Sequence, residues 1–352
     1  MAGLALADLG ADVVKVERPG RGDPFRNFGL TRNGVSAFWL NVNRGKRSIQ
    51  LDLTLDDGRD RFLRLVAASD VVIQNSRPGV AEALGVGDDV LAATNQRAIR
   101  LAITGFGSTG PRAAEPVFDS VVQALSGLAH AQGHPGRPHT VATAIIDKCT
   151  ALVAVQAVLA ALVERSATKR GRRVEVAMLD VAAYFNFVDL FQSRTFLADD
   201  RRIPPTRSPV VKTSDGHIVV TPVSGRQIGR TAEAMGHPEW KDELKATGGA
   251  GNPIERLLEL VESATQHLPT EEALGRLRAH DVPAAPVHDL DDHLVDAQVL
   301  HNDLYSSSSS PIVGPVRVVR HPALFDGTPQ LPRFTLPRAG EHEAEVFEEW
   351  QA

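Results

Sequence analysis

The residues of this chain that could do chemistry are carboxylates and cations placed beside apolar segments. Asp147 is the clearest case, because it directly precedes a long run of Ala, Val and Leu in "ATAIIDKCTALVAVQAVLAALVER". A carboxylate at the start of a helix accepts a hydrogen bond from an unpaired backbone N–H, which stabilises the helix by about 1 kcal/mol. Helix capping is therefore the local interpretation of Asp147, and the rest of the chain decides whether this carboxylate also reacts.

Cations and an amide follow several strand-like segments. Arg18 follows "VVKVE", and "QNSRPG" adds Asn75 and Arg77 after a short apolar strand. In open α/β sheets ligands bind outside the carboxyl ends of the strands, where an arginine is well placed to contact a diphosphate. Taken one at a time, these side chains are ordinary solvated surface groups, as are Arg26, Lys46 and Arg47.

A glycine-rich segment, "GFGSTG", has the spacing of a dinucleotide-binding loop. Such a loop opens a helix whose N-terminus holds the pyrophosphate, and Pro116 disfavours a helix here. We therefore expect no nicotinamide cofactor, and interpret Gly105 and Gly107 as part of a turn beside a substrate or of an ordinary surface turn. The histidines show no metal-ligand spacing, so no metal is expected. The single cysteine, Cys149, is interpreted as a small hydrophobe within the apolar run.

The elements that must position these residues alternate between strand and helix. The strand-like segments "KRSIQLDL", "DVVIQN", "RAIRLAITGFG" and "RRVEVAML" are separated by helical segments such as "DDGRDRFLRLVAAS" and "GDDVLAATNQ". This alternation predicts an α/β fold with a Rossmann-like, mostly parallel sheet covered by helices on both faces. The chain opens with the end of a helix closed by Gly10 and then a strand, so the first strand of the βαβ unit is expected to be missing. The helix from Lys148 to Arg165 is apolar nearly all round, which predicts burial.

The change of sequence pattern along the chain predicts two domains and a C-terminal segment that packs back on the first domain. Residues 1–200 form the large α/β domain, and residues 206–305 form a smaller α+β domain that begins with the hairpin "VVKTSDGHIVV". Asp215-Gly216 is expected to supply the positive φ angles of its turn. The run from Ser306 to Ser310 is interpreted as a connector, and residues 311–352 are expected to pack back on the large domain.

Composition limits the class of protein. The chain has 352 residues, a net charge of -5 and one cysteine. A mildly acidic chain is a poor general nucleic-acid binder, and one cysteine forms no intrachain disulfide. With no secretory signal or membrane span apparent in the sequence, we expect a cytoplasmic protein that contacts neither membrane nor nucleic acid.

Taken together, the segments resemble one family. "LADLGADVVKVERPGRGDPFR", "NVNRGKRSIQLDL", "SDVVIQNSRPG", "ITGFGSTGP", "FDSVVQALSG", "IIDKCTALVAVQAVLAALVER" and "GRRVEVAMLD" occur in the order and spacing of the class III CoA-transferases (CaiB/BaiF type), the formyl-CoA and carnitine CoA-transferase group. The resemblance extends to "DVPAAPVHDLDDHLVDAQVL" and the closing "PRAGEHEAEVFEEW". It covers almost the whole chain and is specific for the family, but not for the substrate.

The resemblance implies an activity and a set of site residues. Asp147 takes the place of the covalent nucleophile, which forms a mixed anhydride and then an aspartyl-CoA thioester while CoA moves from an acyl-CoA to a carboxylic acid. Arg18 resembles a ligand of the CoA diphosphate, and Leu51 and Asn75 resemble residues of the nucleotide groove. Further candidates are Arg77 for CoA, with Gly105 and Gly107 as donors to a developing oxyanion. Coenzyme A or acyl-CoA is thus the expected substrate, and an interlocked homodimer the expected assembly.

Two questions stay open at this stage. Asp119 lies where relatives carry an acid near the site, but it also precedes "SVVQALSGL" as the N-cap of that segment. The family includes α-methylacyl-CoA racemases, which carry a histidine where this chain has Phe118, so transfer is favoured unless His130 or His134 substitutes. Relatives begin about twenty residues earlier, with a strand that adds a catalytic Gln and CoA contacts. A noncatalytic acyl-CoA-binding protein is therefore the other alternative.

Overall fold

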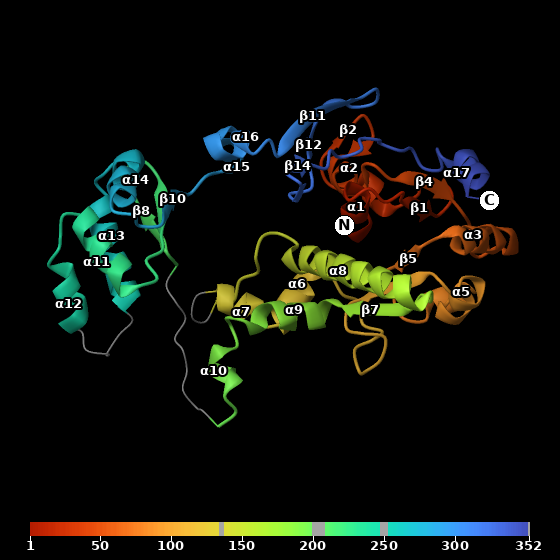
Figure 1. Ribbon diagram of the computed structural model, residues 1–352, viewed down its shortest axis with the longest axis horizontal. Helices are drawn as coiled ribbons and strands as arrows, with labels where there is room; N and C mark the ends of the chain where they lie inside the picture. The colour runs from red at the N-terminus through yellow and green to blue at the C-terminus, as the bar shows by residue number, and fades with distance from the viewer. Residues whose placement is uncertain (134–136, 199–207, 247–252, 351–352) are drawn as a thin grey trace. The chain divides into compact units, whose positions relative to one another are not determined.

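The computed structural model describes residues 1–133, 137–198, 208–246 and 253–350. The chain divides into two compact units (Figure 1). Unit 1 comprises residues 1–201 and 303–352, and unit 2 comprises residues 202–302. Each unit is described by itself.

Parallel strands form the frame of unit 1. Strand β1 (Val14–Glu17) pairs with β4 (Arg47–Gln50), and a second sheet has the order β5 (Val71–Gln74), β6 (Ile99–Thr104), β7 (Arg173–Ala177). Parallel neighbours need a crossover, and helices supply it here. The predicted α/β fold with parallel strands is confirmed, although the described parallel strands of unit 1 form two hydrogen-bonded groups and not one continuous sheet.

Helices and short hairpins complete unit 1 (Figure 1). The helices that matter for the site are α1 (Ala2–Asp8), α6 (Asp119–Leu125), α7 (Leu128–Gln132), α8 (Ile145–Thr168) and α9 (Met178–Phe187). The others are η1 (Pro24–Asn27), α2 (Ala37–Asn43), α3 (Asp56–Ala68), α4 (Val80–Ala83), α5 (Asp88–Thr94), α10 (Gln192–Thr195) and α17 (Glu343–Glu349). The short strands are β2 (Thr31–Arg32), β3 (Val35–Ser36), β13 (Leu324–Phe325) and β14 (Thr328–Pro329).

The start of the chain folds as its glycine predicts. Helix α1 ends just before Gly10, which has a φ of 102° that a side chain would strain, and β1 follows. Helix α1 packs against helix α8 through Ala2 and Leu6. This contact places the start of the chain beside the helix that carries Asp147.

Helix α8 is buried on one side only. Ala154 and Val158 are fully buried against Ile99 and Leu101 of β6. The opposite side exposes large apolar side chains, namely Leu152, Leu159 and Val163, of which Val163 is 73% exposed. The expectation of burial all round is therefore wrong for this side, because unit 1 offers a sheet to only one face of the helix. Among the described residues α8 also has the length and hydropathy of a membrane span, a test that core helices of soluble proteins pass as well.

The serine run is a strand and not a connector. Residues Tyr305–Ser310 form β11, which pairs with β12 (Gly314–Val319) in an antiparallel hairpin. The side chain of Asn33 donates to the carbonyl of Ile312 at its turn, at 2.7 Å. The sequence prediction fails here because a strand needs a partner and backbone hydrogen bonds, and small polar side chains on its faces do not prevent it.

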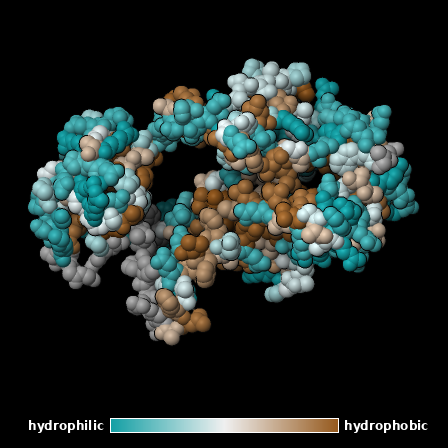
Figure 2. All heavy atoms as spheres, in the orientation of Figure 1, coloured by the Kyte–Doolittle hydropathy of each residue, from teal (hydrophilic) through white to brown (hydrophobic). Residues whose placement is uncertain are grey.

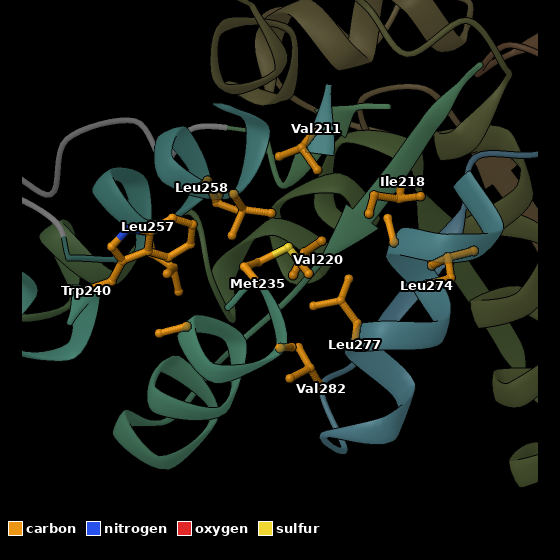
Figure 3. Close-up of a cluster of buried hydrophobic side chains, with 14 of the residues drawn as sticks. Val211, Ile218, Val220, Met235, Trp240, Leu257, Leu258, Leu274, Leu277 and Val282 are labelled. Carbon is orange, nitrogen blue, oxygen red and sulfur yellow. The ribbon is translucent and has the colours of Figure 1, made fainter. Parts of the chain in front are cut away.

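Unit 2 is a small α+β body with its own core. Its strands have the order β10 (Ala284–Pro286), β9 (His217–Val220), β8 (Val210–Lys212), all antiparallel. Its helices are α11 (Gly225–Ala234), α12 (Trp240–Ala246), α13 (Pro253–Thr265), α14 (Thr270–Ala279), α15 (Leu290–Val295) and α16 (Ala297–His301). Figure 3 shows apolar side chains from β8, β9 and helices α11 to α14 converging, with Ile218, Leu257 and Leu277 fully buried.

The hairpin of unit 2 has a different turn from the one expected. Neither Asp215 nor Gly216 has a positive φ angle, so the positive φ prediction is wrong. The loop is closed by the Thr213 N–H, which donates to the Gly216 carbonyl at 3.0 Å. Asp215 instead accepts hydrogen bonds from the N–H and hydroxyl of Thr270, at 2.8 and 2.6 Å. It therefore caps α14 from a distant part of the sequence.

Candidate active site

Asp147 lies in the first turn of α8, but it does not cap that helix. The N-cap residue is Ala144, and no side chain of the helix itself closes its start. The Asp147 side chain is exposed to solvent, and no hydrogen bond or ion pair of its carboxylate is found within the described part of the chain. The local capping interpretation is therefore wrong, and a carboxylate at this place is free to meet a ligand.

Asp119 supplies the cap that Asp147 does not. One oxygen of its carboxylate, Oδ1, accepts the N–H of Ile146 at 2.7 Å and that of Asp147 at 3.0 Å. Asp119 is 8% exposed and is the first residue of α6, whose N-cap is Phe118. It is therefore the cap of α8 and not of its own helix. Helices α6 and α8 are held together at the residue where chemistry is expected.

The surroundings of Asp147 favour its neutral form. Although the residue is exposed, neighbouring atoms desolvate part of its carboxyl, which raises the pKa above the usual 3.8, and the nearby charge of Asp119 raises it further. The amino group of Met1, at the start of α1, acts in the opposite direction when it is protonated. A carboxylate with a raised pKa is more basic, and so a better nucleophile once it is ionised.

The N–H groups at the start of α8 and that of Gly107 already have acceptors. In the first turn of α8 the N–H of Ile145 donates to the carbonyl of Thr143 at 2.7 Å, and the N–H of Lys148 donates to the carbonyl of Ala144 at 3.2 Å. The N–H groups of Ile146 and Asp147 donate to the carboxylate of Asp119. The N–H of Gly107 donates to the hydroxyl of Thr104 at 3.0 Å. These N–H groups are therefore not available to an oxyanion at Asp147, and the N–H of Gly105 remains a candidate.

Gly105 has a steric reason to be glycine. A Cβ added there would lie 2.1 Å from Cγ1 of Val117, so no side chain fits between β6 and the loop that leads to α6. Its carbonyl accepts the N–H of Leu179 at 3.0 Å. Gly107 has a φ of 99° and forms the turn itself. Both glycines shape the loop that carries Val117 toward Asp119.

The candidates for CoA binding follow the carboxyl ends of parallel strands. Arg18 follows β1 and is exposed, beside a cavity of about 250 Å³ that Lys15, Asp23 and Phe25 also line. Leu51 follows the neighbouring strand β4 but is 3% exposed, because its side chain packs in a cluster with Ile49 and the C-terminal helix α17. Its side chain is thus part of the core beneath this edge and not of an open groove.

Asn75 and Arg77 follow β5, at the same end of the second sheet as Gly105 and Gly107, which follow β6. Both side chains are exposed, and neither makes a hydrogen bond or ion pair within the described residues. Gly79, with a φ of 85°, then turns the chain into α4. Two polar groups without protein partners at a strand end are available to a ligand.

Sequence reasoning missed a buried cation that directly precedes β4. Lys46 is 8% exposed, and its Nζ donates to Oδ1 of Asn43 at 2.8 Å. Burial, followed by the charge of Lys15, lowers its pKa to about 7. No local pattern distinguishes it from a surface lysine, because the residues that cover it come from α1 and α2. Gln123 of α6, 1% exposed, was missed for the same reason.

The described residues offer only weak candidates for racemisation, for catalysis by a thiol or for metal binding. Phe118 stands 78% exposed beside Asp119 and cannot transfer a proton, His130 lies on α7, and His134 lies outside the described residues. The thiol of Cys149 has a raised pKa, because of burial and the charge of Asp119, and is therefore a poor nucleophile. No cluster of three or more metal-ligating side chains occurs among the described residues.

Similarity to known proteins agrees with this site. The model of CoA-transferase family III matches residues 1–343. The chain is 33% identical to the succinate–glutarate CoA-transferase of Agrobacterium fabrum, over 99% of this chain and 91% of that protein. It is also 33% identical to the succinyl-CoA–L-malate CoA-transferase beta subunit of Chloroflexus aurantiacus, over 98% and 88% of the two chains.

Solved structures show the same architecture. A CAIB/BAIF family protein from Brucella suis is 28% identical, with a TM-score of 0.83 over 99% of this chain and 94% of that one. Rv3272 from Mycobacterium tuberculosis is 29% identical, with a TM-score of 0.83 over 98% and 94% of the two chains. The named relatives do not favour the racemase alternative. The chain belongs to CoA-transferase family III, and it is a CoA-transferase.

Proposed function

We propose that this enzyme moves CoA from an acyl-CoA thioester to a free carboxylic acid through covalent intermediates on Asp147. The observation that carries the proposal is the contrast at the start of α8. Every backbone donor of the first turn has an acceptor, whereas the Asp147 carboxylate has no partner among the described residues and a raised pKa. A group of this kind is suited to attack a bound carbonyl.

The proposed reaction conserves the thioester bond energy in two symmetric halves. The Asp147 carboxylate attacks the donor carbonyl, so that a C–O bond forms, the C–S bond breaks and CoA thiolate leaves a mixed anhydride. The thiolate then attacks the Asp147 carbonyl, which releases the donor acid and leaves an aspartyl-CoA thioester. The acceptor carboxylate repeats both steps in reverse order and regenerates Asp147. No proton has to be moved, so the reaction as proposed needs no histidine base beside Asp147.

We assign the nucleotide end of CoA to the strand ends of unit 1. Arg18 supplies a guanidinium for the diphosphate, and Asn75 and Arg77 supply free donors on the second sheet. Leu51 serves only as the apolar floor of that edge, since its side chain is buried. Binding energy from this remote part of CoA is available to hold the thioester against Asp147.

We further propose that the acids exchanged are short dicarboxylates. The support is the names of similar proteins, which include succinate, glutarate and L-malate. Succinyl-CoA is therefore the donor with which to begin, and glutarate and L-malate are the first acceptors. Acetate serves as the matched monocarboxylate.

A homodimer in the cytoplasm is the proposed state. Large apolar side chains stand exposed on α8, on α9 and at the end of α9 in unit 1. They include Val163, Tyr184, Phe187 and the C-cap residue Val188, at 73%, 79%, 55% and 83%. Figure 2 shows apolar residues in brown at the surface of this unit. Exposed apolar surface on this scale is typical of a protein interface. Light scattering of the purified protein tests the assembly, with twice the chain mass expected.

Trapping with hydroxylamine tests the proposed function. Protein incubated with succinyl-CoA and hydroxylamine should accumulate a hydroxamate on the peptide that contains Asp147, and lose transferase activity as it does. Asp147→Asn should show neither change. A wild-type protein that binds succinyl-CoA, leaves Asp147 unmodified and transfers nothing would instead be a noncatalytic binder.

A further inference from the structure

Gln123 is a buried amide whose hydrogen bonds converge on the first turn of α8. Its side chain is 1% exposed. Its Oε1 accepts the N–H of Val141 at 2.8 Å, and its Nε2 donates to Oδ2 of Asp119 at 2.5 Å. Two longer contacts, at 3.4 Å, join the same nitrogen to the carbonyls of Val141 and Thr143.

The orientation of this amide is fixed by its partners. The backbone N–H of Val141 can only donate, so the atom facing it must be the Gln123 oxygen. The nitrogen then necessarily faces Asp119, which accepts it as a carboxylate. One side chain on α6 thereby joins Asp119, the segment at 141–143 that leads into α8, and, through Asp119, the backbone of Asp147.

We propose that Gln123 is a positioning residue for the transfer reaction: it orients Asp119, and Asp119 in turn holds the backbone of Asp147 where its side chain meets the thioester. The inference rests on the proposed function of Asp147. It is carried by the chain of bonds from Val141 N–H to Gln123, from Gln123 to Asp119, and from the Asp147 N–H to Asp119. The two linking side chains, Gln123 and Asp119, are both buried, whereas the Asp147 side chain at the end of the chain of bonds is exposed.

The same series of hydrogen bonds that positions Asp147 also holds a negative charge beside it. Asp119 holds negative charge beside Asp147, which raises the pKa of that carboxyl after burial has done so. Among the described residues, Lys148 follows Asp147 on α8, and its Nζ donates to the Thr143 hydroxyl at 2.5 Å. The amino group of Met1, whose pKa burial lowers to about 5, acts on Asp147 only when it is protonated. Gln123 donates to the carboxylate of Asp119 and so holds its charge at the start of α8.

Exchanging the two side chains tests the proposal. In Asp119→Asn the amide oxygen still accepts the two N–H groups of α8, but its NH₂ faces the NH₂ of Gln123. In Gln123→Glu two carboxylates oppose each other at the 2.5 Å contact. In the double variant the amide introduced at position 119 donates to the carboxylate introduced at position 123, which still accepts from the Val141 N–H. Charge and hydrogen-bond pattern are restored, except for the two longer contacts of Gln123 to carbonyls.

Each single variant should lower kcat about 100-fold, as expected when a reacting group is misplaced, and leave KM for succinyl-CoA nearly unchanged. The double variant should recover about tenfold of that loss, because the two residues are coupled. Asp119→Asn should also move the acid limb of the pH profile of kcat/KM to lower pH, since a negative charge is removed from beside Asp147. Gln132→Glu, an exposed change on the neighbouring helix α7, is the control for added charge and should behave as wild type.

A second measurement tests the effect of Asp119 on Asp147 separately from the transfer activity. A carbon NMR titration of aspartate-labelled protein, with the Asp147 signal assigned by Asp147→Asn, should show the Asp147 pKa falling in Asp119→Asn. This result does not require turnover, so it stands even when no transfer is found in the wild type. The proposal is overturned if single variants that fold, as judged by circular dichroism, transfer CoA like the wild type. It is equally overturned if the double variant is no better than the singles and the acid limb does not move.

Discussion

Two carboxylates of unit 1 have opposite surroundings, and the difference separates a structural role from a chemical one. Glu17, at the end of β1, is 5% exposed and surrounded by donors. It accepts from Nε and Nη2 of Arg26 at 2.8 and 2.6 Å, from the Ser48 hydroxyl at 2.6 Å and from the Asp23 N–H at 2.9 Å. Asp147 is exposed, and its carboxylate has no such donor within the described residues.

Their pKa values move in opposite directions for this reason. Burial acts to raise the pKa of Glu17, but the bonds from Arg26 and Ser48 outweigh it and hold the value below the usual 4.5. At Asp147 burial and the charge of Asp119 act together, and the pKa is raised. A carboxylate that is fully bonded stabilises the fold and cannot react, whereas one left without donors keeps its nucleophilicity.

The largest expected effect is on activity and falls on Asp147 alone. Asp147→Asn should lower transfer by about 10⁴-fold or more, because the side chain is the nucleophile, while the affinity for CoA stays nearly unchanged. Steady-state kinetics with succinyl-CoA and a CoA-binding titration measure both. Asp89→Asn, an exposed acid of α5, is the matched control and should be neutral. Transfer close to the wild-type rate in Asp147→Asn would exclude the nucleophile assignment.

For stability, the larger effect is expected from substitution of Glu17 and the smaller from substitution of Asp147. Glu17→Gln should lower the free energy of unfolding by about 3 kcal/mol, because it leaves the Arg26 guanidinium buried against Trp39 without its counter-charge. Asp147→Asn should leave that free energy unchanged or raise it, since it removes repulsion from Asp119. Urea denaturation of the wild type and the two variants measures this. Equal losses in the two variants would remove the distinction between the carboxylates.

The pH dependence of stability should follow the ionisation of Glu17, and that of activity should follow the ionisation of Asp147. Glu17 has a depressed pKa, so its contribution to stability is present above about pH 4.5 and is lost as the pH falls through the folded value. Asp147 has a raised pKa, so its ionisation opposes folding as the pH rises above 3.8, and its activity requires that ionisation. Glu17→Gln should therefore shrink the acid limb of stability and leave the acid limb of activity in place, as measured by denaturation and kinetics as functions of pH. An activity limb that moves in Glu17→Gln would count against the account.

The smallest expected effect concerns the cap in unit 2. Asp215 caps α14 as Asp119 caps α8, from outside the helix, but it is fully exposed and far in sequence from any residue of the site. Asp215→Ala should lower the stability of the folded chain by less than Glu17→Gln does, since it removes an exposed cap, and leave kcat and its pH profile unchanged. Thermal denaturation and steady-state kinetics test this pair of outcomes. If Asp215→Ala shifted the acid limb of the pH profile, loss of a helix cap would be enough to change that limb even where the cap is not beside the nucleophile.

The sequence predicts what local pattern controls. Strands such as β5 and β6, the turn at Gly10 and the place of Asp147 at the start of a long apolar helix follow from periodicity and composition. The family resemblance is confirmed by the match over residues 1–343. These features depend on residues close together in the chain.

What the sequence does not predict depends on contacts between distant residues. Asp119 and Ile146 are separated by 27 positions, so nothing local shows that Asp119 caps α8 or that the N–H groups there are occupied. Lys46 looks like a surface cation until α1 and α2 cover it. The serine run becomes a strand only because β12 pairs with it.

Oxygen transfer tests the central claim most directly. In the proposed cycle one oxygen of the acceptor carboxylate remains on Asp147 when the acyl-CoA product leaves. A single turnover of wild-type protein with succinyl-CoA and ¹⁸O-labelled glutarate, followed by mass spectrometry of the peptide that contains Asp147, should show one heavy oxygen in that side chain and none elsewhere. Label absent from Asp147 while glutaryl-CoA accumulates would contradict a covalent path through this carboxylate.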